Sequence, residues 1–144
     1  MKLNVYYDLK YCPITFDFTS FLVTSNAIRQ SIGYKTMGVT IVCDGFRKQS
    51  PRDLETTIEQ KRWRVSHILS KLPFLIPEVD SVTVTDSPLS GIQFPAFPGG
   101  YPPAPGTSWE FPYLTSEFIQ FYNTDINLRP FRSSEGAKKL INNL

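Results

Sequence analysis

Residues 3–8 read LNVYYD, and this stretch decides how the rest of the chain is interpreted. Its apolar, β-branched and aromatic residues lack the alternation of a half-exposed strand, which is typical of a strand covered on both faces. Two later stretches also predict strands that stop at an aspartate: residues 37–43 (MGVTIVC), again of buried character, before Asp44, and residues 81–85 (SVTVT) before Asp86. The sequence therefore predicts three short buried strands, each of which ends at an acidic residue.

Helical patterns lie between these strands. Residues 15–32 place apolar side chains at helical spacing, and Gly33 follows as a C-terminal cap. We expect Thr15 or Asp17 to cap the N-terminus of this helix. A second helix is predicted to begin near Thr56, where the spacing of the side chains fits a capping box.

The alternation of strands and helices determines the predicted fold class. Parallel neighbours need long return connections, and such connections are almost always right-handed. The expected sheet order is therefore third, second, first strand. We predict an α/β fold, a Rossmann-like β-α-β-α-β three-layer sandwich with a small parallel sheet, as a single domain over residues 1–144.

Residues 87–114 break this pattern, because they hold seven of the 12 prolines together with six aromatic residues. A flexible linker would lack the aromatic rings, so we interpret the stretch as an ordered, irregular loop. A solvent-exposed proline-rich segment that binds a partner is the alternative. C-terminal helices are predicted at residues 115–123 and 135–144, the second capped by Ser133 or Ser134.

The chain stops on the second of these helices, where a doubly wound domain would normally add another strand. We therefore expect the sequence to be a truncated domain, the N-terminal part of a longer protein.

The bulk composition disfavours several classes of function. The formal net charge of +2 is too small to indicate a nucleic-acid partner, and the longest apolar runs are too short to span a membrane. Two cysteines and one histidine do not supply the ligands of a metal site or the base of a convincing hydrolytic triad. We expect a cytoplasmic protein with no metal and no cofactor.

Ligands of open parallel sheets bind beyond the carboxyl ends of the strands, so the loops after the strands are where a site is expected. The first such loop, residues 8–17, contains no glycine and therefore fits neither a dinucleotide fingerprint nor a P-loop. Asp8 is the candidate general base or ligand of a substrate hydroxyl, although a carboxylate there can also serve only to accept loop N–H groups. For Thr15 the helix-cap interpretation is the stronger one.

The second strand-end loop leads into the most basic part of the chain. Residues 47–71 hold seven of the 15 basic side chains and three of the 13 acidic ones. Arginine forms bidentate pairs with phosphate and carboxylate groups, so the region predicts an anion site. A solvated helix face is the alternative, and it explains Lys61, Arg64 and Lys71 well. The predicted ligand-binding residues are Lys10, Thr15, Asp44, Arg47, Lys48, Arg52, Arg62 and Asp86, and the predicted catalytic residue is Asp8.

Four segments carry a resemblance to a known group of proteins: YYDLKYCPITFDF (6–18), CDGFRKQSPRDL (43–54), EQKRWRVSHIL (59–69) and LRPFRSSEGAKKL (128–140). Together they resemble the N-terminal half of an uncharacterised bacterial family that is similar to GT-B glycosyltransferases. Enzymes of this kind consist of two facing Rossmann-like domains. The resemblance implies that this domain shapes the acceptor side, while a missing C-terminal domain holds most of the nucleotide-sugar.

The resemblance also implies where a site would lie. Asp8, Lys10, Asp44, Arg47 and Arg52 would face the cleft between the two domains, and the fragment alone would be inactive. The expected partners are then a sugar acceptor or nucleotide-sugar, and either the missing domain or a second copy of the chain. Two alternatives stay open: a non-catalytic domain that binds a nucleotide or phosphorylated metabolite, and a protein-interaction module that uses the proline-rich loop.

Overall fold

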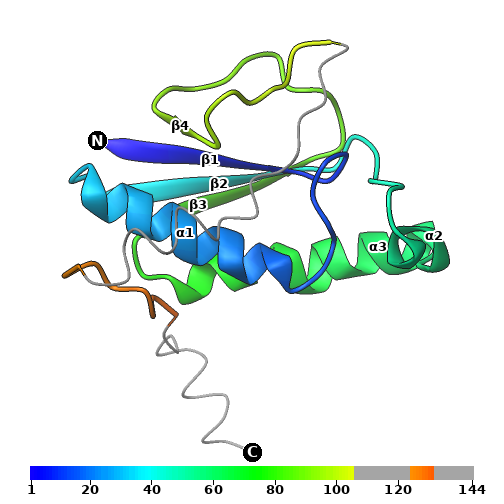
Figure 1. Cartoon of the computed structure of the whole chain (residues 1–144), viewed down its shortest axis with the longest axis horizontal. Coiled ribbons are helices and arrows are strands. Elements are labelled where there is room, and N and C mark those ends of the chain that lie inside the picture. Colours follow the sequence, from blue (N-terminus) through cyan, green and yellow to red (C-terminus); the bar gives the residue numbers. More distant parts are fainter. Residues whose placement is uncertain (106–123, 132–144) are drawn as a thin grey trace, which may run out of the picture.

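The computed structural model describes residues 1–105 and 124–131, which form a four-stranded, all-parallel sheet with helices packed against it (Figure 1). The sheet order is β3-β2-β1-β4. The strands are β1 (Lys2–Asp8), β2 (Thr36–Val42), β3 (Val79–Thr85) and β4 (Ala96–Phe97). The predicted Rossmann-like α/β class, the parallel pairing and the order of the first three strands are confirmed.

The register of the central pair aligns the ends of the strands. β1 pairs with β2 without a shift, from Lys2 opposite Thr36 to Asp8 opposite Val42. β2 and β3 pair with one irregularity, at Met37/Gly38. Because all three strands run in the same direction, their carboxyl ends form one edge of the sheet, and the loops that carry the predicted acids start from that edge.

The first helix, α1 (Asp17–Ser31), follows β1 and lies close to its predicted position. Gly33 has a φ of 75°, a left-handed conformation that favours glycine, so the predicted helix end is confirmed. The predicted N-terminal cap is wrong, because the cap residue is Phe16 and no side chain caps the helix. Instead, the Thr15 hydroxyl donates a hydrogen bond of 2.6 Å to the Asp17 carboxylate, so the two candidate caps satisfy each other.

The second connection contains the predicted helix as α3 (Ile58–Arg64) running directly into the π-helical turn η1 (Val65–Leu69). Two further short helical pieces flank it: α2 (Pro51–Glu55) before it and the 3₁₀ turn η2 (Leu72–Leu75) after it.

Each of the first two pieces along the chain, α2 and α3, begins with its own capping box. Ser50 and Asp53 form the first, with a proline at the start of α2, and Thr57 and Gln60 form the second. The predicted box at Thr56 is therefore one residue early: Thr56 is extended and ends α2.

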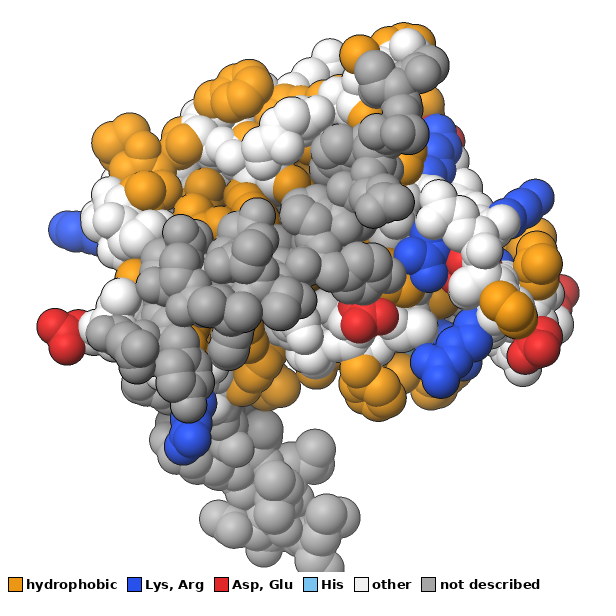
Figure 2. Space-filling view, in the orientation of Figure 1, with side chains coloured by type: hydrophobic (Ala, Val, Ile, Leu, Met, Phe, Trp, Pro, Cys, Tyr) orange, Lys and Arg blue, Asp and Glu red, His pale blue; other side chains and the backbone are white. Residues whose placement is uncertain are grey.

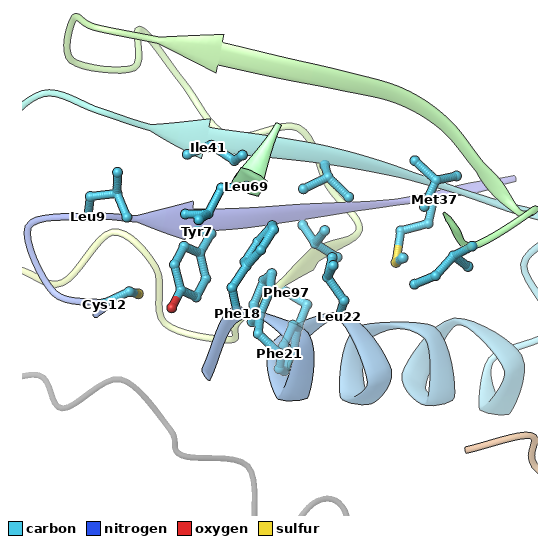
Figure 3. Packing of buried hydrophobic residues seen from close by; sticks show 14 of the residues in the cluster. Tyr7, Leu9, Cys12, Phe18, Phe21, Leu22, Met37, Ile41, Leu69 and Phe97 are labelled. Carbon is cyan, nitrogen blue, oxygen red and sulfur yellow. The ribbon is translucent and has the colours of Figure 1, made fainter. Parts of the chain in front are cut away.

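The two faces of the sheet are covered by different material. The described helices lie on one face, and the irregular segment 86–105 crosses the other (Figure 1). β1 contacts both layers through neighbouring residues. Tyr7 packs among the rings of Phe18 and Phe21 on the helical side (Figure 3). Tyr6 instead stacks on Tyr101, with 5.7 Å between the ring centroids. The continuous apolar character of β1 thus reflects burial on both sides.

The proline-rich loop is ordered over its described part, residues 87–105, as predicted. Its strand β4 adds to the free edge of β1, where Asn4 lies opposite Ala96 and Val5 opposite Phe97. Phe97 is buried and stacks on Phe21. The sequence does not reveal β4, because prolines flank its two residues and prolines normally argue against a strand.

The predicted helices 115–123 and 135–144 lie outside the described residues. Between them, Asn127 and Gln30 exchange two hydrogen bonds of 3.0 Å, which hold segment 124–131 against α1. Among the helices that the structure describes, none is long and apolar enough to cross a membrane.

Candidate functional site

A cleft of about 200 Å³ opens at the carboxyl ends of β1 and β2. Three of its lining residues are charged: Asp8, Lys10 and Asp44. The rings of Tyr11 and Tyr101 also line it, and apolar residues of the proline-rich loop complete the wall. The structure therefore brings three of the predicted site residues together at the predicted edge of the sheet.

Asp8 is the most buried charge in this cleft, with 7% of its surface exposed. Its Oδ1 accepts the backbone N–H of Lys10 at 3.0 Å, and its Oδ2 accepts the Tyr101 hydroxyl at 2.7 Å. The first bond shows that Asp8 accepts a loop N–H group, which is the structural role considered above as the alternative to catalysis. A carboxylate has about four acceptor positions, so two such bonds leave capacity for a ligand hydroxyl.

Tyr101 connects the proline-rich loop to this carboxylate. The residue is buried, and the pKa of its phenol is raised by burial and by the hydrogen bond that it donates to Asp8. Tyr101 therefore stays a neutral donor throughout the ordinary pH range. It holds the second layer of the fold against the end of β1.

We expect Tyr101→Phe to lower the free energy of unfolding by about 1 kcal/mol, because one buried hydrogen bond to a charged group is lost while the ring remains. Urea unfolding followed by circular dichroism measures the change. Tyr34→Phe is the matched control, since Tyr34 packs half-buried against the core and its hydroxyl makes no hydrogen bond to the residues that the structure describes. Equal losses in the two variants would contradict the assigned role of the Tyr101 hydroxyl.

Lys10 and Asp44 form an ion pair at the mouth of the cleft. The distance from Lys10 Nζ to Asp44 Oδ2 is 2.7 Å, and the hydrogen bond to Asp44 raises the pKa of Lys10. Gly45 has a φ of 127°, and a Cβ there would meet the Lys10 side chain at 3.3 Å. Glycine thus allows both the turn after Asp44 and the close approach of the Lys10 stem.

Arg47, predicted to hold an anion, is paired with a carboxylate of the protein itself. Its Nε and Nη2 donate to the two carboxylate oxygens of Asp53 at 3.0 and 3.3 Å, and both side chains are largely buried. The backbone N–H groups of Gln49 and Ser50 also donate to Asp53. The Arg47 backbone N–H also donates to the Leu9 carbonyl, and this hydrogen bond holds the second strand-end loop against the first.

The pKa of Asp53 reflects this environment. Burial alone would raise it, but the hydrogen bonds from Arg47 and from the Gln49 and Ser50 N–H groups outweigh burial and lower the pKa from 3.8 to about 2. The ionised carboxylate is therefore the form that stabilises the fold.

We expect the corresponding stability to be present above about pH 5 and to be lost as the pH falls through 3.8 towards 2. The size of the loss is about 2 kcal/mol for this one group. Urea unfolding at several pH values between 2 and 6, compared with Asp53→Asn, isolates it. An identical pH dependence in the wild-type protein and the variant would contradict the assignment.

The remaining predicted residues lie outside this cleft. Lys48, Arg62 and Asp86 are exposed and are not among its lining residues. Arg62 and Asp86 act in opposite directions on the pKa of the Cys43 thiol, which burial raises. Both charges therefore lie within electrostatic reach of the end of β2 without entering the cleft.

Thr15 and Arg52 line a different cavity, beside α2. The other predicted site residues, apart from the three exposed ones described above, thus fall into three groups: those in the cleft at the strand ends, the Arg47–Asp53 pair and those at the cavity beside α2. The two lining tyrosines were not predicted as site residues. Tyr101 is 93 residues away from Asp8 along the chain, and nothing in its own neighbourhood indicates that it reaches a carboxylate.

In the part of the chain that the structure describes, no three His, Cys, Asp or Glu side chains form a cluster that could hold a metal ion. The single histidine, His67, stacks on Trp63 at 4.6 Å, and its Nδ1 lies within hydrogen-bonding distance of the Ser66 hydroxyl and the Trp63 carbonyl. His67 is thus an exposed histidine whose ring already has hydrogen-bonding partners on its own helical turn.

The fold and the cleft together define a Rossmann-like α/β domain with a small polar cleft at the carboxyl edge of its sheet. The chain matches no protein-family model, no curated protein and no solved structure. The class of the domain therefore rests on its own topology and on the geometry of its cleft.

Proposed function

We propose that the cleft binds a sugar or a similar polyhydroxylated molecule, and that the domain is the acceptor side of a GT-B-like glycosyltransferase. One observation carries the proposal: the carboxylates of Asp8 and Asp44, the Lys10 ammonium and the rings of Tyr11 and Tyr101 converge on one cleft at the carboxyl ends of β1 and β2. This is the edge where open parallel sheets take their ligands.

The chemistry of these groups suits hydroxyl-rich ligands. Carboxylates accept hydrogen bonds from hydroxyl groups, and an ammonium group donates to their oxygens. A tyrosine ring offers a flat apolar surface for the C–H face of a sugar. The volume of about 200 Å³ is below the roughly 300–1,000 Å³ of sites for drug-sized ligands, so the cleft suits a fragment the size of one sugar ring.

In a transfer reaction, Asp8 is the group that would accept the proton of the attacking hydroxyl. A general base must lie within hydrogen-bonding reach of the proton that it takes, and Asp8 is the buried carboxylate in the wall of the cleft. The Tyr101 hydroxyl and the Lys10 N–H fix the orientation of its oxygens. The nucleotide-sugar would then be held mainly by a second domain, as the resemblance to GT-B enzymes implies.

Isothermal titration calorimetry of the whole chain against monosaccharides and nucleotide-sugars tests the proposal. We expect Asp44→Asn to weaken the binding of a responding sugar about tenfold, because a charged hydrogen-bond partner is lost. Asp86→Asn is the matched control, since Asp86 also follows a strand but does not line the cleft. Binding that is absent for every sugar, or weakened equally by both substitutions, would overturn the proposal.

The same titrations separate the alternative of a phosphometabolite-binding domain. A ligand that is recognised through its phosphate alone would compete with inorganic phosphate for the protein, and its affinity would not change in Asp44→Asn. That result would favour the alternative over the sugar site.

A further inference from the structure

We propose that the domain has a second ligand site, in the cavity beside α2, and that this site takes an anion with an apolar body. The cavity measures about 380 Å³ and lies between the loop before α1, the helix α2 and the turns η1 and η2. It shares no lining residue with the cleft at the strand ends. The inference is therefore independent of the sugar site.

The inner wall of the cavity is apolar. Ile14 and Leu69 are buried residues of the core, and Ile68 and Leu72 are half-buried beside them. Phe16 stands at the rim with 82% of its surface exposed. Such a wall favours a ligand whose body is hydrocarbon, because that ligand removes apolar surface from water on binding.

The rim of the cavity carries two guanidinium groups. Among the described residues, no hydrogen bond or ion pair engages the Arg52 side chain, and Arg64 makes one long hydrogen bond of 3.4 Å to the Ile14 carbonyl. Arginine presents five N–H donors, so most of these donors stay available to a carboxylate or phosphate group. Figure 2 shows basic, acidic and hydrophobic side chains intermingled at the end of the molecule formed by α2 and α3.

The acids near this rim do not cancel its positive charge. Asp53 also lines the cavity, but its carboxylate is paired with Arg47. Glu55 is then the single acid opposed to the two arginines among the lining residues. The rim favours a head group that carries negative charge and accepts hydrogen bonds.

The size of the cavity suits an organic molecule. A volume of about 380 Å³ falls within the roughly 300–1,000 Å³ of sites that enclose organic molecules. An anionic head on a medium-length alkyl or aryl body meets both the arginine rim and the apolar wall. Carboxylates and phosphate monoesters share this chemistry.

Calorimetric titration of the whole chain with octyl phosphate and with octanoate, both below their micelle concentrations, tests the inference. We expect saturable 1:1 binding of at least one of them, and binding weakened about tenfold or more by Arg52→Gln and by Arg64→Gln. Arg62→Gln is the matched control, because Arg62 is an exposed arginine on the same helix as Arg64 and does not line the cavity. Octyl glucoside and inorganic phosphate, which each lack one half of the ligand, are expected to bind much more weakly.

Three results would overturn the inference: no binding of either anion, equal binding of octyl glucoside, or equal weakening by Arg62→Gln. Circular dichroism of each variant separates loss of binding from loss of fold. Since Asp44→Asn removes a group from the other cleft, it is expected to leave octyl phosphate binding unchanged. A failure of the sugar proposal would therefore not affect this one.

Discussion

Asp53→Ala is expected to lower the free energy of unfolding by about 3 kcal/mol, because it removes the carboxylate that pairs with the largely buried Arg47 guanidinium. The same substitution removes the acceptor for the Gln49 and Ser50 N–H groups and breaks the capping box of α2. Urea or thermal unfolding measures the loss. The Asp53 side chain thus combines an ion pair, two bonds to backbone N–H groups and a helix cap.

Glu55→Ala is the matched control for this prediction. Glu55 belongs to the same short helix and is exposed, so its loss is expected to change the free energy of unfolding by less than about 0.5 kcal/mol. A small effect of Asp53→Ala, similar to that of Glu55→Ala, would show that the Arg47–Asp53 pair does not organise the loop. In that case Arg47 would again be a candidate ligand for an external anion.

The second large effect is expected for Phe21→Ala, at about 3–5 kcal/mol of unfolding free energy. Phe21 has no exposed surface, and its ring contacts Tyr7 of β1, Phe18 of α1 and Phe97 of β4 (Figure 3). The substitution thus leaves a cavity where three elements meet. It also removes a ring that supports β4, so we expect faster amide hydrogen exchange at Asn4, whose N–H bonds to the Pro95 carbonyl.

Phe16→Ala is the matched control for the aromatic core, because Phe16 is a phenylalanine next to the same helix with 82% of its surface exposed. We expect a change of less than about 0.5 kcal/mol in its unfolding free energy. Comparable losses for Phe16→Ala and Phe21→Ala would contradict the packing described for the core.

The strands and their order were predictable because their signals are local. Each of the first three strands is a short β-rich run, and each run is separated from the next by a segment long enough for a helical crossover. Because such crossovers are right-handed, connections that lie on the same face of the sheet add each strand next to the previous one, which gives the order third, second, first. The structure confirms that order and adds β4, whose two residues lie between prolines and make no local strand pattern. The predicted burial of the third strand is wrong: β3 is an edge strand in which most residues are half-buried or exposed, and Val84 has 45% of its surface exposed.

Helix boundaries were less predictable, because neighbouring polar residues compete for the same cap. Thr56 and Thr57 both have a suitable residue three positions later, and the box forms at Thr57. The choice follows from α2, which ends at Glu55 and uses Thr56 as its extended C-terminal residue. The sequence contains both options, and only their connection to the rest of the chain selects one.

The candidate site was also predictable only in part. The position of Asp8 and Asp44 follows from the sequence, because an aspartate at or just after a buried parallel strand must lie at the carboxyl edge of the sheet. The basic residues were predicted to join them from their proximity along the chain. In the structure, Arg47 bonds to Asp53, and Arg52 lies at a separate cavity.

The sequence by itself thus determined the α/β class, the parallel pairing and the acidic edge, since these depend on hydrophobic pattern and on the length of connections. Only the tertiary structure decided that Tyr101 bonds to Asp8 and that the arginines divide between an internal pair and a second cavity. The physical reason is that such contacts depend on distances between residues far apart in the chain or on the paths of irregular loops. No local preference of a side chain encodes those distances.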